Sequence, residues 1–186
     1  MLKLCVFLAL SFVACHGAPN KASGTFCGVT PNNMFKCLNN PRVLDLEAAA
    51  KCTSQVKECE KITCVFREQK WSKRGVIDKA KIRAHFEQYE TEHPEWAQAV
   101  QHVKAFCLAP ELRAQGVFLN CPAYDIMQCA LASFIKHASP SVWSTEQNCD
   151  YPKAYAADCP VCPSDCYSAA IPIGSCNACY LQPRTV

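Results

Sequence analysis

Sixteen cysteines among 186 residues constrain the fold of this chain more than any other feature. The sequence begins with MLKLCVFLALSFVACHGA, in which one lysine precedes an apolar run and small residues follow it, the layout of a secretory signal peptide. We predict that residues 1–17 are this signal, with cleavage between Cys15 and Ala18. Loss of Cys5 and Cys15 leaves an even number of cysteines in a compartment that oxidises thiols. The secreted, extracellular chain is therefore expected to be held by disulfides.

Charge and hydropathy exclude several classes of partner. The net charge is +3, from 19 basic and 16 acidic residues, which is too balanced to specify nucleic acid or an anionic membrane surface. The apolar run of the signal is about a dozen residues long, well short of the roughly 20 that cross a bilayer. We therefore predict no nucleic-acid partner and no membrane span.

Helical patterning extends over most of the chain after the signal. No proline and only one glycine, Gly75, occur between Arg42 and His93, and no alternating strand pattern of useful length is present. The expected helices cover residues 43–58, 59–70, a third helix capped by Asp78, a fourth begun by Pro94, 122–137 and 150–158. We predict an all-α domain of about six helices at 18–160, with an irregular Cys/Pro-rich tail at 161–186 packed on it.

The spacing of six central cysteines is the most specific signal in the sequence. Cys59 and Cys64 lie five residues apart on a predicted helix, so their side chains diverge by about 140° and we do not expect them to pair with each other. The six are Cys37, Cys59, Cys64, Cys107, Cys121 and Cys129. This set, with the segments CPAYDIMQC and CVFREQKWSKRGVIDKAKIRAHF, resembles the insect odorant-binding proteins, which have six cysteines in an all-α shell.

The later cysteines are similar to those of one subfamily. The segment SPSVWSTEQNCDYPKAYAADCP and the dipeptide Cys159-Pro160 resemble the Plus-C subfamily, which has additional bridges. Cys59 and Cys64 have four residues between them where the family commonly has three, and the tail adds four cysteines beyond Cys159. Ser139 stands where Plus-C relatives usually carry a cysteine. One expected bridge is therefore missing or rerouted through the tail.

The resemblance also implies a disulfide pairing. In the family, the first cysteine pairs with the third, the second with the fifth and the fourth with the sixth. Carried over to this chain, that pairing implies Cys37–Cys64, Cys59–Cys121 and Cys107–Cys129. The cysteines whose partners stay open are Cys27, Cys52, Cys149, Cys159, Cys162, Cys166, Cys176 and Cys179.

A metal site and an enzyme are the two chemical alternatives to a binding protein. The spacings Cys159-x-x-Cys162 and Cys176-x-x-Cys179 are also those of zinc knuckles, but zinc requires thiolates, which an oxidising compartment converts to cystines. We therefore predict no metal and no cofactor. The histidines after the signal, none of which lies in a nucleophile or metal-hydrolase motif, are His85, His93, His102 and His137. We predict that the protein is not an enzyme.

The resemblance implies a carrier that binds small hydrophobic molecules, such as odorants or pheromones, in an apolar cavity enclosed by the cross-linked helices. The predicted ligand-binding residues are aromatic and apolar side chains on the inward faces of the helices: Phe86, Tyr89, Trp96, Val100, Phe106, Phe118, Tyr124, Met127, Leu131 and Phe134. An olfactory receptor or a second copy of the chain are further partners for such a carrier. Because His85 and His102 lie on the predicted pocket-forming helices, we predict that ligand binding is weaker at acidic pH.

A second class of function stays open on the sequence alone. A secreted cysteine-rich interaction protein, such as a protease inhibitor or a non-olfactory carrier, would share the composition and the disulfides. An inhibitor needs an exposed, rigid loop between cystines, and the one stretch that could serve is PSDCYSAAIPIGSC in the tail.

Overall fold

The computed structural model describes residues 25–27, 29–55, 57–112, 115 and 120–161. The predicted signal peptide at 1–17, the tail beyond Val161 with its last four cysteines, and Phe118 lie outside the described residues.

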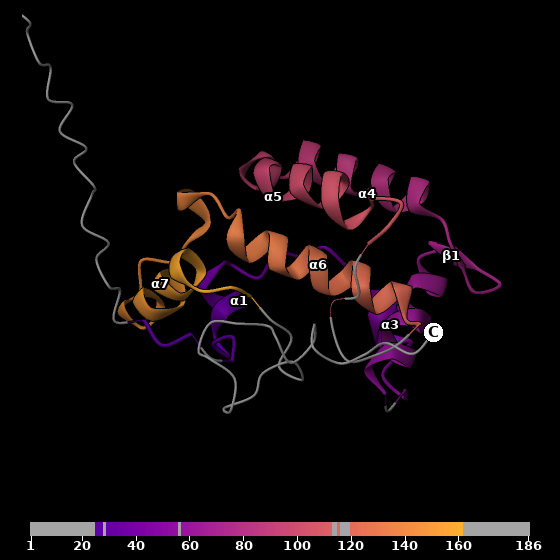
Figure 1. The fold of residues 1–186 in the computed structure, drawn as a ribbon, viewed down its shortest axis with the longest axis horizontal. Coiled ribbons are helices and arrows are strands. Elements are labelled where there is room, and N and C mark those ends of the chain that lie inside the picture. The colour runs from indigo at the N-terminus through magenta and orange to yellow at the C-terminus, as the bar shows by residue number, and fades with distance from the viewer. Residues whose placement is uncertain (1–24, 28, 56, 113–114, 116–119, 162–186) are drawn as a thin grey trace, which may run out of the picture.

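Helices make up most of the described chain (Figure 1). The elements are α1 (Met34–Cys37), α2 (Leu46–Ala50), α3 (Glu58–Glu68), β1 (Ser72–Lys73), β2 (Val76–Ile77), α4 (Lys79–Glu92), a 3-10 turn (Pro94–Trp96), α5 (Ala97–His102), a π-helical turn (Val103–Cys107), α6 (Pro122–Lys136), 3-10 turns at Pro140–Val142 and Gln147–Cys149, and α7 (Asp150–Asp158). The prediction of a mostly helical, disulfide-linked fold is confirmed.

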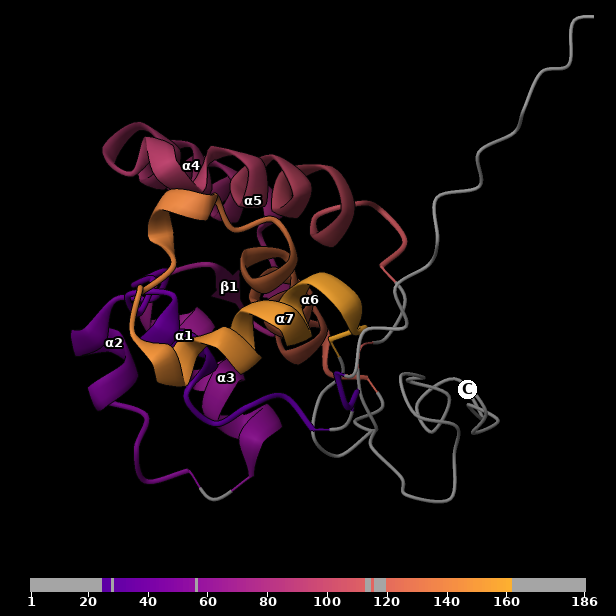
Figure 2. The ribbon, with the colours of Figure 1, turned by 90° about the vertical axis from the view of Figure 1, so that its left-hand side faces the viewer.

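Helix α6 lies at the centre of the arrangement. Helices α4 and α5 run side by side along one flank of it, α3 contacts its first half, and α7 packs near its end (Figures 1 and 2). Pro122 occupies its first turn, where the missing N–H costs nothing, and most of its residues are buried. One core cluster therefore extends through α6 to the other helices.

Helix α2 is much shorter than the helix expected at 43–58. The carboxylate of Asp45 caps it by accepting from the N–H groups of Glu47 and Ala48, at 2.7 and 3.1 Å. It ends at Ala50 because Cys52 is bonded to Cys64, with Cα atoms 5.8 Å apart over a separation of 12 residues. A straight helix would hold positions that far apart in sequence about 18 Å apart, so the chain has to turn before α3.

A small hairpin, which the sequence analysis did not predict, follows α3. Ser72 and Lys73 pair with Ile77 and Val76 through a two-residue turn at Arg74 and Gly75. Both turn residues have positive φ, 52° and 80°, as the tightest hairpin turns require, and glycine adopts this conformation without strain. The strands are too short to alternate, which is why no periodicity signals them.

Helices α4 and α5 begin as predicted. The Asp78 carboxylate caps α4 by accepting from the N–H of Lys81 at 3.2 Å, and Pro94 opens the turn that leads into α5. The chain from Pro94 to Cys107 is a continuous helical run in which 3-10, α and π turns succeed one another. In the π turn, Val103 and Cys107 are buried.

Five disulfides join the ten cysteines at described positions. They are Cys27–Cys159, Cys37–Cys149, Cys52–Cys64, Cys59–Cys121 and Cys107–Cys129. The last two are the pairs that the family resemblance implies.

The implied pair Cys37–Cys64 is not formed and is corrected. Helix α1 packs against α7, which brings Cys37 to Cys149, while α2 packs against α3 and brings Cys52 to Cys64. Ser139 takes no part in a bridge: its hydroxyl caps the 3-10 turn that follows, accepting from the N–H of Ser141.

The pairing can be tested by digesting the unreduced protein with trypsin, which cleaves after Lys and Arg. This places Cys37, Cys52, Cys64 and Cys149 in separate peptides. Because each of these thiols is committed to one partner, we expect mass spectrometry to find peptide 37–42 linked to 137–153, and 52–57 linked to 62–67. A link between 37–42 and 62–67 would contradict the fold of this end of the molecule.

Candidate ligand-binding site

Four of the predicted ligand-binding aromatics form a packed cluster at the centre of the fold. The ring of Phe134 on α6 lies 6.3 Å from that of Phe86, 5.8 Å from Tyr89 and 5.1 Å from Trp96, measured between ring centroids. None of the four is more than 6% exposed. These rings contact one another, as aromatic side chains do in a core.

The other predicted residues divide between the core and the surface. Val100, Tyr124 and Met127 are buried and Leu131 is half-buried. Phe106 is 60% exposed, so its expected inward position is wrong. It lies in the π turn, where Val103 and Cys107 take the inward positions, and its ring stacks on His102 at 4.4 Å.

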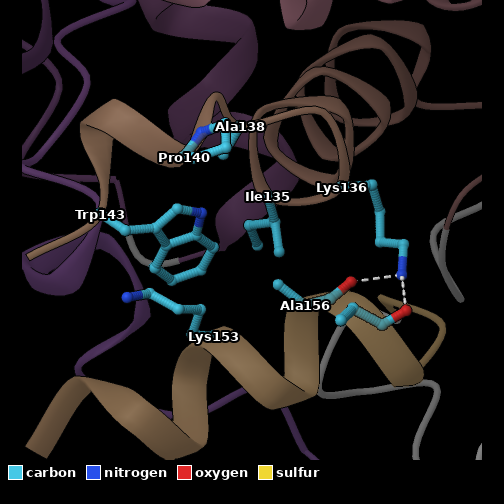
Figure 3. Close-up of a pocket in the computed structure, with 8 residues that line it drawn as sticks. Ile135, Lys136, Ala138, Pro140, Trp143, Lys153 and Ala156 are labelled. Atoms are coloured by element: carbon cyan, nitrogen blue, oxygen red, sulfur yellow. Dashed lines mark hydrogen bonds between the residues drawn. The ribbon is translucent and has the colours of Figure 1, made fainter.

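An apolar groove opens near the C-terminal end of α6 (Figure 3). It has a volume of about 320 Å³ and is lined by Ile135, Lys136, Ala138, Pro140, Trp143, Lys153, Ala156 and Ala157. Ile135 and Ala156 are buried and form the floor, while Trp143 and Ala138 are half-buried walls. We call this set the apolar groove. Two of its eight residues are charged, and both are lysines.

The wall that carries Trp143 is tied to the start of the described chain. The N–H of Ser144 donates to the carbonyl of Cys37 at 2.8 Å, and the amide of Asn39 donates to the carbonyl of Val142 at 2.9 Å. These bonds flank the tryptophan on both sides, so its backbone is held in place.

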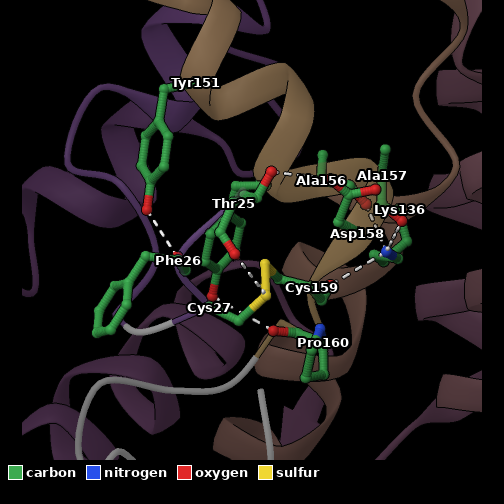
Figure 4. Close-up of a disulfide and its surroundings, with 11 residues drawn as sticks. Thr25, Phe26, Cys27, Lys136, Tyr151, Ala156, Ala157, Asp158, Cys159 and Pro160 are labelled. Carbon is green, nitrogen blue, oxygen red and sulfur yellow. Dashed lines mark hydrogen bonds between the residues drawn. A yellow bond between two sulfur atoms is a disulfide. The ribbon is translucent and has the colours of Figure 1, made fainter. Parts of the chain in front are cut away.

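The opposite wall, helix α7, is fixed at both of its ends. Cys149, just before the helix, is bonded to Cys37, and Cys159, just after it, is bonded to Cys27 (Figure 4). Around the second bridge, the hydroxyl of Tyr151 donates to the carbonyl of Phe26 at 2.7 Å. The groove therefore lies between two walls whose spacing the covalent structure determines.

Lys136, at the end of α6, connects the two helices through its ammonium group. This group donates to the carbonyls of Ala156, Ala157 and Cys159, the last two at 3.3 and 3.1 Å. Terminal helix carbonyls lack partners within the helix, and a cation there also meets the negative end of the helix dipole. Burial lowers the pKa of Lys136, and the Asp158 carboxylate acts in the opposite direction.

A second groove, which is more polar, runs between α4 and the segment after α1. Its volume is about 530 Å³, and its lining is Asn39, Asn40, Pro41, Arg42, Tyr89, His93, Glu95, Trp96, Ser141 and Val142. Burial is the larger and the nearby Glu95 the smaller of two causes that raise the pKa of Tyr89 to about 12. A hydrogen bond with the Arg42 backbone acts in the opposite direction. The phenol is neutral at physiological pH. An apolar ligand here would desolvate charged groups, which disfavours its binding.

His102 and His137 stack on each other beside α6. Their ring centroids are 4.2 Å apart, and Nδ1 of His102 lies 2.9 Å from the hydroxyl of Ser133. That hydroxyl donates to the carbonyl of Cys129 at 2.7 Å, so it can accept a hydrogen bond from the protonated Nδ1 of a neutral imidazole. Burial, and then the neighbouring His137, lower the pKa of His102.

The residues that line the apolar groove were not among the predicted site residues, although Tyr89 and Trp96 line the polar one. Periodicity selects residues on the inward face of a helix, whereas this groove combines the end of α6, an irregular segment and one face of α7. The one available signal is Trp143, a tryptophan in the irregular segment between α6 and α7.

Comparison with known proteins returns no match among protein-family models, curated proteins or solved structures. Among the described residues, no helix has the length and hydropathy to cross a membrane, and no group of three or more potential ligand side chains could hold a metal ion. The fold and the grooves thus define a mostly helical protein, cross-linked by disulfides, with small-molecule-sized surface grooves.

Replacing Lys136 by Met tests its role in joining α6 to α7. The variant leaves three carbonyls without a donor, so we expect the free energy of unfolding to fall by about 1–2 kcal/mol in a urea titration followed by circular dichroism. Lys153→Met is the matched control, since Lys153 makes no hydrogen bond or ion pair with any described residue, and should stay within about 0.5 kcal/mol of the parent. Equal losses in the two variants would rule out the capping role.

The lowered pKa of His102 predicts a pH-dependent stability. Well above the ordinary histidine pKa of 6.5, His102 is a neutral imidazole in both the folded and the unfolded chain. As the pH falls through that value the unfolded chain binds the proton first, so this contribution to stability is lost on acidification. Melting temperatures at about pH 7 and 5 should therefore differ less in His102→Gln than in the parent, and an equal difference in the two proteins would contradict this prediction.

Proposed function

We propose that this protein is an extracellular carrier that binds small hydrophobic molecules, and that the apolar groove is where it binds them. The observation that carries the proposal is the groove of about 320 Å³ between Trp143 and α7, with Ile135 and Ala156 as its floor. Its volume lies at the lower end of the about 300–1,000 Å³ that small-molecule sites occupy.

The energetics fit reversible binding. Removing about 300 Å² of apolar surface from water, counted over ligand and groove, yields about 7.5 kcal/mol at 25 cal/mol per Å². That corresponds to a dissociation constant of about 3 µM before ordering costs are subtracted. Two disulfides and the Lys136 bonds already hold the walls, which keeps those costs low.

The extracellular location in the proposal is supported by the cysteines. All ten at described positions are paired, and such a density of structural disulfides is typical of chains that fold in an oxidising compartment.

Odorants and pheromones are the ligand class suggested by the resemblance to Plus-C odorant-binding proteins. Two of the three disulfides that the resemblance implies are formed, which supports this ligand class. Cys37 and Cys64 are bonded to other cysteines instead of to each other, which weighs against applying the whole family pattern to this chain. We therefore propose the ligand class by its chemistry, as small and apolar. The proposal assigns no catalytic step, metal or cofactor to the protein.

The inhibitor alternative depends on the tail stretch PSDCYSAAIPIGSC, which lies outside the described residues. No observation on the described part of the chain favours it over the carrier.

Binding can be measured with phenylnaphthylamine, an apolar dye whose emission rises when it leaves water. We expect saturable binding with a dissociation constant of about 10 µM. Ala157→Phe introduces a ring at an exposed position in the groove lining and should weaken binding at least about tenfold, because the ring occupies the ligand's volume.

Ala84→Phe provides the matched control, because Ala84 is an exposed alanine of α4 outside this groove. It should leave the affinity unchanged. Absence of saturable dye binding by correctly oxidised protein would refute the carrier function, and equal weakening by both variants would place the site elsewhere.

A further inference from the structure

The two lysines of the apolar groove differ in what their charges contact. The ammonium of Lys136 is directed to the end of α7, where it is bonded to backbone carbonyls (Figure 3). Lys153 projects from α7 toward Trp143 on the other side of the groove. Among the described residues, no hydrogen bond or ion pair involves Lys153.

Lys153 forms no ion pair with a described residue although a carboxylate lies nearby on the same helix. Asp150 lies three residues earlier on the same helix, a spacing at which opposite charges often pair on a helix surface. Asp150 is in the first turn of α7, where a carboxylate is stabilised by the positive end of the helix dipole. No ion pair of the described residues joins it to Lys153, so the ammonium keeps its charge available at the groove.

The remainder of the lining offers no second charge to a ligand. Ile135, Ala138, Pro140, Trp143, Ala156 and Ala157 present apolar side chains. A molecule that fills the groove thus meets an apolar surface over most of its length and one cation at the rim. The chemistry complementary to that arrangement is an apolar tail that ends in an anion.

We propose that the apolar groove selects acyl carboxylates, with the tail against Ile135 and Trp143 and the carboxylate paired with Lys153. This inference rests on the proposed carrier function and specifies its ligand class. An acyl carboxylate can be distinguished from an uncharged volatile ligand by measurement, because a carboxylate and an alcohol with the same tail share every contact except the charged one. A medium-chain tail suits the volume of about 320 Å³.

The expected preference is modest because Lys153 is exposed. Pairs between exposed charges contribute little because water screens them, so an affinity advantage of about 1.5-fold to fivefold is expected for the carboxylate, and it should shrink as salt is added.

The test compares decanoate with decanol as competitors of bound phenylnaphthylamine, at about pH 7.5, where a carboxylic acid is ionised. The parent should bind decanoate about 1.5-fold to fivefold more tightly than decanol. Lys153→Gln should abolish that difference, and Lys153→Arg should retain it. Lys61→Gln, at an exposed lysine of α3 outside the groove, is the matched control and should behave as the parent.

The outcomes separate this inference from the carrier function. Equal displacement by decanoate and decanol, or a preference that survives Lys153→Gln, would overturn the carboxylate selectivity and leave the carrier function standing. Failure of both compounds to displace the dye, or of the dye to bind, would overturn both proposals.

Discussion

The two longest disulfide spans of the described residues hold helix α7, which forms one wall of the proposed site. Cys37–Cys149 and Cys27–Cys159 join positions separated by 112 and 132 residues, and α7 lies between their second cysteines. Closing loops of this length restricts the unfolded chain strongly, whereas the helix itself has nine residues, too few to be stable alone in water. Helix α7 thus stays in place because of covalent bonds to the start of the domain, and the apolar groove has its second wall for the same reason.

Helix α6 links the core to this wall within three consecutive residues. Phe134 enters the aromatic cluster with Phe86 and Trp96, Ile135 forms the floor of the apolar groove, and Lys136 is bonded to the end of α7. Successive residues on a helix point about 100° apart, so three neighbours can serve three different surroundings. Packing in the core therefore sets the position of the groove floor, and a change of α6 orientation would alter both.

The sequence predicts the parts of this structure that depend on residues close together in the chain, and it misses the parts that depend on distant residues. The beginnings of α4 and α6 depend on local chemistry, an aspartate cap and a proline in the first turn, and both were predicted. The length of α2 depends on a disulfide, and the hairpin depends on the turn at Arg74 and Gly75, so periodicity missed both. The pairing of Cys37 required knowing that α1 packs on α7. The groove was missed for a similar reason, because it combines segments that become neighbours only in the fold.

The two lysines of the groove show how similar residues come to differ in function. The side chain of Lys136 is exposed, but its ammonium donates to three carbonyls and is part of the fold, since removing it would leave those carbonyls without this donor. Lys153 remains hydrated at the rim, where its charge contributes little to stability because water screens it. A charge that the fold does not use can be committed to a ligand at low cost, because binding breaks no internal pair. The same groove therefore separates the cation that maintains its walls from the cation that is available to select what enters it.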